Sequence, residues 1–171
     1  MTETLTDAVP DHVDDAVERL LEAACERELS LVTAESCTGG LFASILTDVS
    51  GKAHAFERGF VTYTNDAKAE MLGVDPALLE DPGPVSEPVA RAMAEGALKN
   101  SHGDLALSVT GFAGPAGPDD EPGLVHFGLA RRNGTTTHRV EHFGSEDRGE
   151  VRLRCLETGL KMLQSAVDEL G

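Results

Sequence analysis

A short apolar segment that leads through a serine and two glycines into a helical pattern constrains this fold more than any other feature. Residues 31–34 are β-prone, and apolar side chains then recur at helical spacing at Leu41, Phe42, Ile45 and Leu46. Ser36 is therefore predicted to lie on a sharp strand-to-helix turn, an arrangement that can present a nucleophile. The alternative is that Ser36 is only the N-cap of the helix.

Gly39 and Gly40, which follow Ser36 in this turn, can adopt positive φ and let a ligand approach the backbone closely. Amides at a helix start carry partial positive charge, so residues 37–40 (Cys37, Thr38, Gly39 and Gly40) are candidates for binding a substrate. They could hold a phosphate or the oxyanion formed when a carbonyl is attacked. Cys37 could also be the nucleophile itself if its thiol were activated.

A second β-prone segment, Phe56 to Thr64, reaches Asn65, a plausible N-cap, and then a helix with Lys68 in its first turn. The field at a helix N-terminus disfavours a cation, so it would lower the pKa of Lys68 toward the range of a useful base. Lys68 is thus a candidate general base for Ser36, with the Tyr63 hydroxyl as a group that could relay or orient the proton. The alternative is an ordinary solvated lysine.

Four segments of the chain occur in the same order as in one known family. They are residues 33–40, residues 56–68, Pro84-Val85-Ser86-Glu87-Pro88-Val89 and Gly111-Phe112-Ala113-Gly114-Pro115. Over residues 13–168 the chain resembles the CinA C-terminal family, whose enzymatic members deamidate nicotinamide mononucleotide. The resemblance implies Ser36 as nucleophile, Lys68 as its base and Tyr63 as an assisting group. It also implies a homodimer.

The Gly/Pro-rich loop from Gly111 to Gly123 departs from the family pattern. A lysine position appears as Glu121, and an acidic side chain there would repel a substrate phosphate. Thr110, Gly111 and Gly114 remain candidates for contacting the substrate, because long loops after a strand often bind ligands. Two alternatives to the deamidase stay open: a module that binds a nucleotide or a protein without turnover, and an amidase for another small amide.

The 171 residues contain 30 acidic and only 14 basic side chains, which gives a formal net charge of −16. Nucleic acids and anionic membranes need clustered cations, so both classes of partner are excluded. An anionic nucleotide would need a local reversal of the field, which Lys68, Arg58 or backbone amides could provide. The composition favours a high-salt cytoplasm, with an ordinary acidic soluble protein as the alternative.

No metal or other cofactor is expected. Cys25, Cys37 and Cys155 form no CxxC pair, and their number indicates a reduced cytoplasmic protein. His138 and His142 are predicted to lie on a strand, where they would be roughly 13 Å apart and could not share one ion. The other histidines are scattered along the sequence.

Glu35 could orient Lys68 or a substrate ribose, or be a structural carboxylate.

The remaining pattern predicts an α/β fold with three α/β/α layers and a mixed sheet in a single domain. Asp11 and Ser86 are expected to cap two helices, a last helix is expected to begin at Ser145, and a strand is expected over residues 105–110. Strands over 124–131 and 135–143, joined at Asn133-Gly134, predict an antiparallel hairpin. Residues 1–10 are expected to be a flexible N-terminus without the features of a signal peptide, and residues 11–171 to form the domain.

Overall fold

The computed structural model describes residues 9–170, so most of the expected flexible N-terminus lies outside the described residues. Val9 packs against the core, and Pro10 precedes the first helix. The elements are α1 (Asp11–Glu26), β1 (Leu31–Glu35), α2 (Leu41–Leu46), a 3₁₀ turn (Ala53–Ala55), β2 (Phe56–Val61), α3 (Asn65–Leu72), α4 (Pro76–Glu80), α5 (Glu87–Lys99), β3 (Leu105–Gly111), β4 (Leu124–Arg131), β5 (Thr137–His142) and α6 (Arg148–Glu169).

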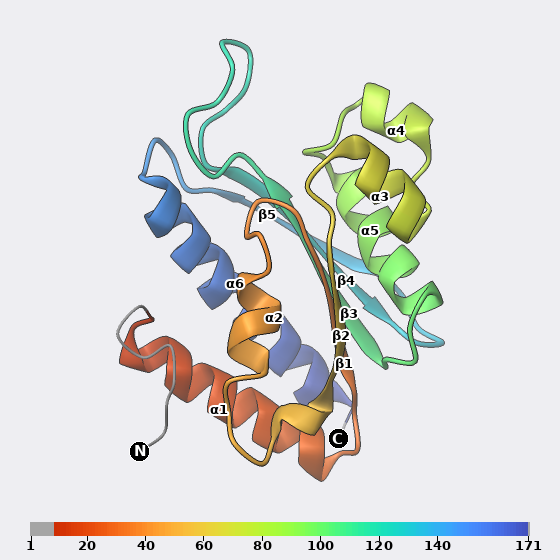
Figure 1. Cartoon of the computed structure of the whole chain (residues 1–171), viewed down its shortest axis with the longest axis vertical. Coiled ribbons are helices and arrows are strands. Elements are labelled where there is room, and N and C mark those ends of the chain that lie inside the picture. The colour runs from red at the N-terminus through yellow and green to blue at the C-terminus, as the bar shows by residue number, and fades with distance from the viewer. Residues whose placement is uncertain (1–8, 171) are drawn as a thin grey trace.

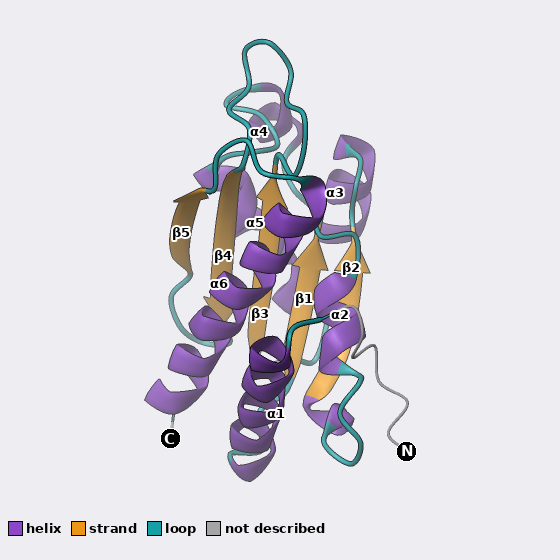
Figure 2. Cartoon of the chain, turned by 90° about the vertical axis from the view of Figure 1, so that its left-hand side faces the viewer, coloured by secondary structure: helices purple, strands orange, loops and turns teal. Residues whose placement is uncertain are grey.

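A single five-stranded sheet has the order β2-β1-β3-β4-β5. β1 pairs in parallel with β2 and β3, whereas β3–β4 and β4–β5 are antiparallel, which confirms the mixed sheet and the predicted hairpin. Helices α1, α2 and α6 cover one face, and α3, α4 and α5 cover the other (Figures 1 and 2). The three-layer α/β/α arrangement predicted from the sequence is therefore confirmed.

The alternation of side chains along the strands divides the core between the two faces. In β3, Leu105, Leu107 and Val109 belong to the cluster under α1 and α6, whereas Ala106 belongs to the cluster under α5. Strands β1 and β3 are buried on both faces, as expected for strands in the middle of a sheet that helices cover on both sides. Within the described residues no helix has the length and hydropathy needed to cross a membrane.

The helix starts differ from the sequence predictions by one to three residues. The N-cap of α1 is Pro10 rather than Asp11, and α6 begins at Arg148 rather than Ser145. Thr64, not Asn65, caps α3, because its hydroxyl accepts the Ala67 amide at 3.1 Å. Ser86 occupies the predicted N-cap of α5, but its hydroxyl donates to the Gly83 carbonyl instead of capping the helix.

Replacing two helical glycines by alanine should change the stability of the protein in opposite directions. A Cβ at Gly96 in α5 would lie 1.9 Å from the carbonyl oxygen of Leu72, so Gly96→Ala must push α3 away from α5. We expect the free energy of unfolding to fall by about 2 kcal/mol, as in other overpacked cores. Gly149 in α6 has no neighbour within 4 Å of such a Cβ, so Gly149→Ala should gain about 0.5 kcal/mol.

Urea unfolding of both variants and the wild type in the same salt measures this difference. Equal midpoints for Gly96→Ala and Gly149→Ala would contradict the close contact between α3 and α5.

Candidate active site

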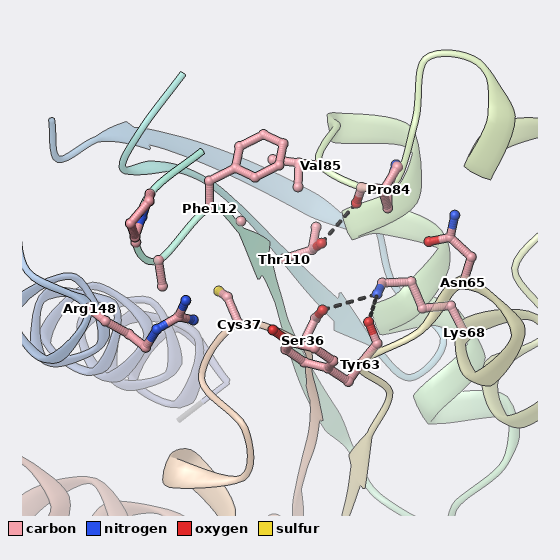
Figure 3. A pocket seen from close by; sticks show the side chains of 14 residues that line it. Ser36, Cys37, Tyr63, Asn65, Lys68, Pro84, Val85, Thr110, Phe112 and Arg148 are labelled. Atoms are coloured by element: carbon pink, nitrogen blue, oxygen red, sulfur yellow. Dashed lines mark hydrogen bonds between the residues drawn. The ribbon is translucent and has the colours of Figure 1, made fainter. Parts of the chain in front are cut away.

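The chain reverses its direction of winding between β1 and β3. From β1 it passes through α2 on one face to β2, and it then returns through α3, α4 and α5 on the other face to β3, on the far side of β1. In open α/β sheets such a switch point leaves a crevice outside the carboxyl ends of the strands. A pocket of about 280 Å³ lies here, lined by Ser36, Cys37, Tyr63, Asn65, Lys68, Pro84, Val85, Thr110, Gly111, Phe112, Ala113, Gly114, Pro115 and Arg148 (Figure 3).

Ser36 is held directly at the end of β1. Its amide donates to the Val109 carbonyl of β3 at 3.0 Å, and the amide of Thr62, which follows β2, donates to the Glu35 carbonyl at 2.8 Å. The chain then turns, with the Gly39 amide donating to the Ser36 carbonyl at 3.1 Å. Ser36 therefore lies on the predicted strand-to-helix turn and lines the pocket, and its side chain is not the helix cap.

Lys68 lies within hydrogen-bond distance of Ser36. Its Nζ is 3.0 Å from Ser36 Oγ, 3.0 Å from the Thr62 carbonyl oxygen and 3.3 Å from the Tyr63 carbonyl oxygen. The side chain is only 2% exposed. Burial lowers the pKa of Lys68 below its ordinary value because the ammonium form loses its hydration, while the nearby Cys37 thiol acts in the opposite direction. Lys68 is therefore not a solvated surface lysine.

Tyr63 contributes through its main chain as well as its side chain. The carbonyl accepts a hydrogen bond from Lys68, whereas the side chain lines the pocket and is 64% exposed. The phenol hydroxyl has no hydrogen bond within residues 9–170. It is thus free to meet a ligand, but it is not part of a preformed relay to Lys68.

Glu35 does not orient Lys68. Its carboxylate accepts the amides of Gly40, Phe42 and Ala43 at 3.2, 3.1 and 2.9 Å, together with the Thr38 hydroxyl at 2.7 Å. A carboxylate at a helix N-terminus satisfies amides that have no partner inside the helix and is favoured by the helix dipole. The sequence left open whether Glu35 has a structural role. The structure shows that it does, because its buried carboxylate caps α2.

This cap removes part of the predicted substrate-binding set. The Thr38 hydroxyl and the Gly40 amide donate to Glu35, and the Gly39 amide donates to the Ser36 carbonyl, so these three donors are already used. Gly39 and Gly40 have the predicted positive φ, 62° and 100°, but neither lines the pocket. Arg58 lies away from the pocket, where it pairs with Glu57 and donates to the Asn100 carbonyl.

The other predicted contacts do line the pocket: Cys37, Thr110, Gly111 and Gly114. Cys37 follows the serine, and its amide makes no hydrogen bond to another backbone group within the described residues. Thr110 is less available than expected, because its hydroxyl donates to the Pro84 carbonyl at 2.8 Å. That bond ties the end of β3 to the segment before α5, and it closes one side of the pocket (Figure 3).

Sequence reasoning missed Arg148, the first residue of α6. Its guanidinium lies at the pocket, and within residues 9–170 it has no ion pair or hydrogen bond. No local motif marks it, because α6 reaches this edge only through the tertiary fold. Pro84 and Val85 were also missed as lining residues, although the segment that contains them is one of the four shared motifs. Asn65 was read as a cap and lines the pocket instead.

Glu121 does not lie in the pocket. Its carboxylate pairs with Nδ1 of His142 at 2.6 Å, at the base of the loop between β3 and β4. The expected repulsion of a phosphate in the pocket is therefore not supported by its position. His138 and His142 both lie on β5, as predicted.

The hairpin also brings His138 to His126, one of the histidines that the sequence had left as scattered, with 2.9 Å between their ring nitrogens. Burial lowers the pKa of both rings, so the neutral forms are favoured. No group of three or more histidine, cysteine or carboxylate side chains within residues 9–170 is arranged to hold a metal ion.

Comparison with known proteins gives consistent results over almost the whole chain. Residues 13–167 match the CinA C-terminal domain. The chain is 44% identical over 161 residues to the nicotinamide-nucleotide amidohydrolase PncC of Escherichia coli K12, an alignment that covers 93% of this chain and 95% of that protein. It is also 45% identical to the CinA-like protein of Chlorobaculum tepidum over 85% of this chain, but it spans only 36% of that longer protein.

The fold agrees with solved structures as well. The competence/damage inducible protein CihA from Agrobacterium tumefaciens superposes with a TM-score of 0.89 at 42% sequence identity, over 94% of this chain and 98% of that one. The family match, the sequence identity and the superposition thus point to one conclusion. The chain belongs to the CinA C-terminal domain family.

Proposed function

We propose that this chain is an amidohydrolase that converts nicotinamide mononucleotide into nicotinic acid mononucleotide and ammonia. The observation that carries the proposal is the 3.0 Å contact between Lys68 Nζ and Ser36 Oγ at the edge of the pocket. The name of the Escherichia coli relative supports this substrate. By the same resemblance we propose a cytoplasmic homodimer that needs no cofactor.

Lys68 acts as the general base in its neutral form. A neutral amine has two N–H donors and one lone pair, and the carbonyls of Thr62 and Tyr63 are placed to accept the two donors. The lone pair then faces Ser36 Oγ, so the serine donates its proton to Lys68 as it attacks the carboxamide carbon. Burial favours this neutral form.

The amide of Cys37 is the first candidate for the oxyanion site. It belongs to the residue after the nucleophile, it lies in the pocket wall, and it has no backbone partner within the described residues. A donor in this position stabilises the charge that develops on the carbonyl oxygen. The amides of Gly40, Phe42 and Ala43 cannot take this part, because they are bound to Glu35.

The reaction is completed by three proton transfers through Lys68. The ammonium returns its proton to the substrate nitrogen, and ammonia leaves from the tetrahedral intermediate. Water then donates a proton to the neutral Lys68 as its oxygen attacks the acyl-serine. Lys68 returns this proton to Ser36 Oγ when the C–O bond breaks, so the serine is regenerated and the acid product leaves and ionises to the carboxylate. Tyr63, exposed at the pocket with a free hydroxyl, is placed to hold the substrate ring or ribose during these steps.

Release of ammonia from nicotinamide mononucleotide by the purified protein tests the proposal. The assay belongs in molar potassium chloride, because the charge of −16 is stabilised by screening. Free nicotinamide and NAD serve as competing amides. Calorimetric binding of the nucleotide without ammonia would point to a binding module instead, and turnover of another amide alone would reassign the substrate.

Arg148 is expected to hold the substrate phosphate. It is an unpaired cation at the pocket in a strongly acidic chain, at the N-terminus of a 22-residue helix. Arg148→Gln should raise the KM for nicotinamide mononucleotide about tenfold, which corresponds to the loss of about 1.4 kcal/mol of binding. The rate with nicotinamide riboside, which lacks the phosphate, should not change.

Arg154→Gln is the matched control, because Arg154 lies on the same helix and pairs with Glu150 outside the pocket. An equal rise in KM for the riboside and the mononucleotide would show that Arg148 does not contact the phosphate.

A further inference from the structure

Two cysteines far apart in the sequence meet beside the nucleophile. Cys37 follows Ser36 at the end of β1, and Cys155 lies within α6; both belong to the same buried cluster. The Cys37 side chain lies near enough to Cys155 in this cluster to raise the pKa of the Cys155 thiol. A hydrogen bond also holds Cys37 against α6, since Nε of Arg152, one turn before Cys155, donates to the Cys37 carbonyl at 2.9 Å.

The two thiols differ in their access to the pocket, which Cys37 lines and Cys155 does not. Cys37 lines the pocket on the α6 side of Ser36, where a small oxidant can reach it (Figure 3). The guanidinium of Arg148 lies at the same pocket. Cys155 is fully buried, and the neighbouring Cys37 side chain, together with burial, raises the pKa of its thiol. Cys37 is therefore the thiol that an oxidant attacks, and Cys155 is the one that resolves it.

We propose that Cys37 and Cys155 form a reversible disulfide under oxidising conditions and that this bond switches off Ser36. Hydrogen peroxide transfers one oxygen to the Cys37 thiolate, which becomes a sulfenic acid while hydroxide leaves. The Cys155 sulfur then attacks the Cys37 sulfur, the S–O bond breaks, and the hydroxyl leaves as water with the Cys155 proton. In sum, two thiols and one peroxide give one disulfide and two waters.

Formation of the disulfide must move the turn between β1 and α2, which carries Ser36 and Cys37. A disulfide holds the two sulfur atoms about 2 Å apart, much closer than two thiols that are not covalently joined. Helix α6 is fixed by a row of buried residues at Val151, Leu156, Leu160 and Leu163. Cys37 instead belongs to the short turn between β1 and α2, so this turn shifts toward α6. A displacement of about 1 Å at a reacting atom can cost on the order of 100-fold in rate, and Ser36 is the adjacent residue.

Peroxide treatment of the reduced protein, followed by peptide mapping without reductant, tests the bond. The wild type should lose two hydrogen atoms and yield a cross-linked peptide that contains Cys37 and Cys155, and dithiothreitol should reverse both changes. Cys25→Ala is the matched control, since Cys25 lies elsewhere, with its thiol near the Lys52 carbonyl, and should leave the cross-link intact. Cys155→Ala should give no cross-link.

The effect on Ser36 is read in two ways. Labelling of Ser36 by phenylmethylsulfonyl fluoride reports its reactivity without any substrate, and ammonia release, which rests on the proposed function, reports turnover. Both should fall at least about tenfold in the oxidised wild type and recover with dithiothreitol. A cross-link that leaves the labelling unchanged would overturn the switch, and absence of the cross-link in the oxidised wild type would overturn the pair itself.

Discussion

Ser36→Ala is expected to lower the hydrolysis of nicotinamide mononucleotide by on the order of 10⁴-fold or more, with the largest effect on kcat. The variant removes the oxygen that would form the acyl-enzyme, while the pocket and Arg148 remain, so substrate binding should survive. Losses of this size are usual when the nucleophile of a serine hydrolase is removed. Steady-state ammonia release together with calorimetric binding of the nucleotide measures both parts of this expectation.

Ser44→Ala provides the control, because Ser44 lies on α2 shortly after the turn and does not line the pocket. It should retain the wild-type rate. If Ser36→Ala kept full turnover, Cys37 would become the candidate nucleophile, and loss of activity in Cys37→Ala would then identify it.

The contact between Ser36 and Lys68 could be predicted from the sequence because its signals are local. Ser36 follows an apolar strand and precedes two glycines, and Lys68 lies four residues into a helix. Each feature restricts the backbone within a few residues. The fold layers could be predicted for a similar reason, because the spacing of apolar residues determines which face of each helix and strand is buried.

The substrate-binding residues were predicted less well, because their roles depend on competition between groups. The amides of residues 37–40 were expected to bind a ligand, but the Gly40 amide donates to the carboxylate of Glu35 and the Gly39 amide donates to the Ser36 carbonyl. No pattern distinguishes a glutamate that caps a helix from one that faces a pocket. Arg148 depends entirely on tertiary structure, since α6 reaches the pocket from the far end of the chain.

At the start of α3, two neighbouring side chains compete for the same capping position. Thr64 and Asn65 are both good capping residues, and the sequence favoured Asn65. In the structure Thr64 caps the helix, which leaves the Asn65 side chain at the pocket. A shift of one residue in the start of α3 therefore converts an apparent structural residue into one that can contact the substrate.

Lys68→Met is expected to lower the activity strongly while it changes the stability little. Turnover should fall by about 10²- to 10⁴-fold, the usual contribution of a general base. The free energy of unfolding should stay within about 1 kcal/mol of the wild type, because two effects oppose each other. Methionine removes a buried amine whose charged form is disfavoured, but it leaves the carbonyls of Thr62 and Tyr63 without their donor. Ammonia release and urea unfolding measure the two quantities.

The pH dependence of the wild type tests the same assignment independently. In the proposed mechanism the active form of Lys68 is neutral, so kcat/KM should fall about tenfold for each pH unit below its pKa. Burial places that pKa below the ordinary lysine value, so the rate should reach its plateau at a lower pH than a solvated lysine would allow. Lys99→Met is the control, because Lys99 lies in the last turn of α5, does not line the pocket and should leave the profile unchanged. A Lys68→Met enzyme with the wild-type rate and profile would show that another group takes the proton from Ser36.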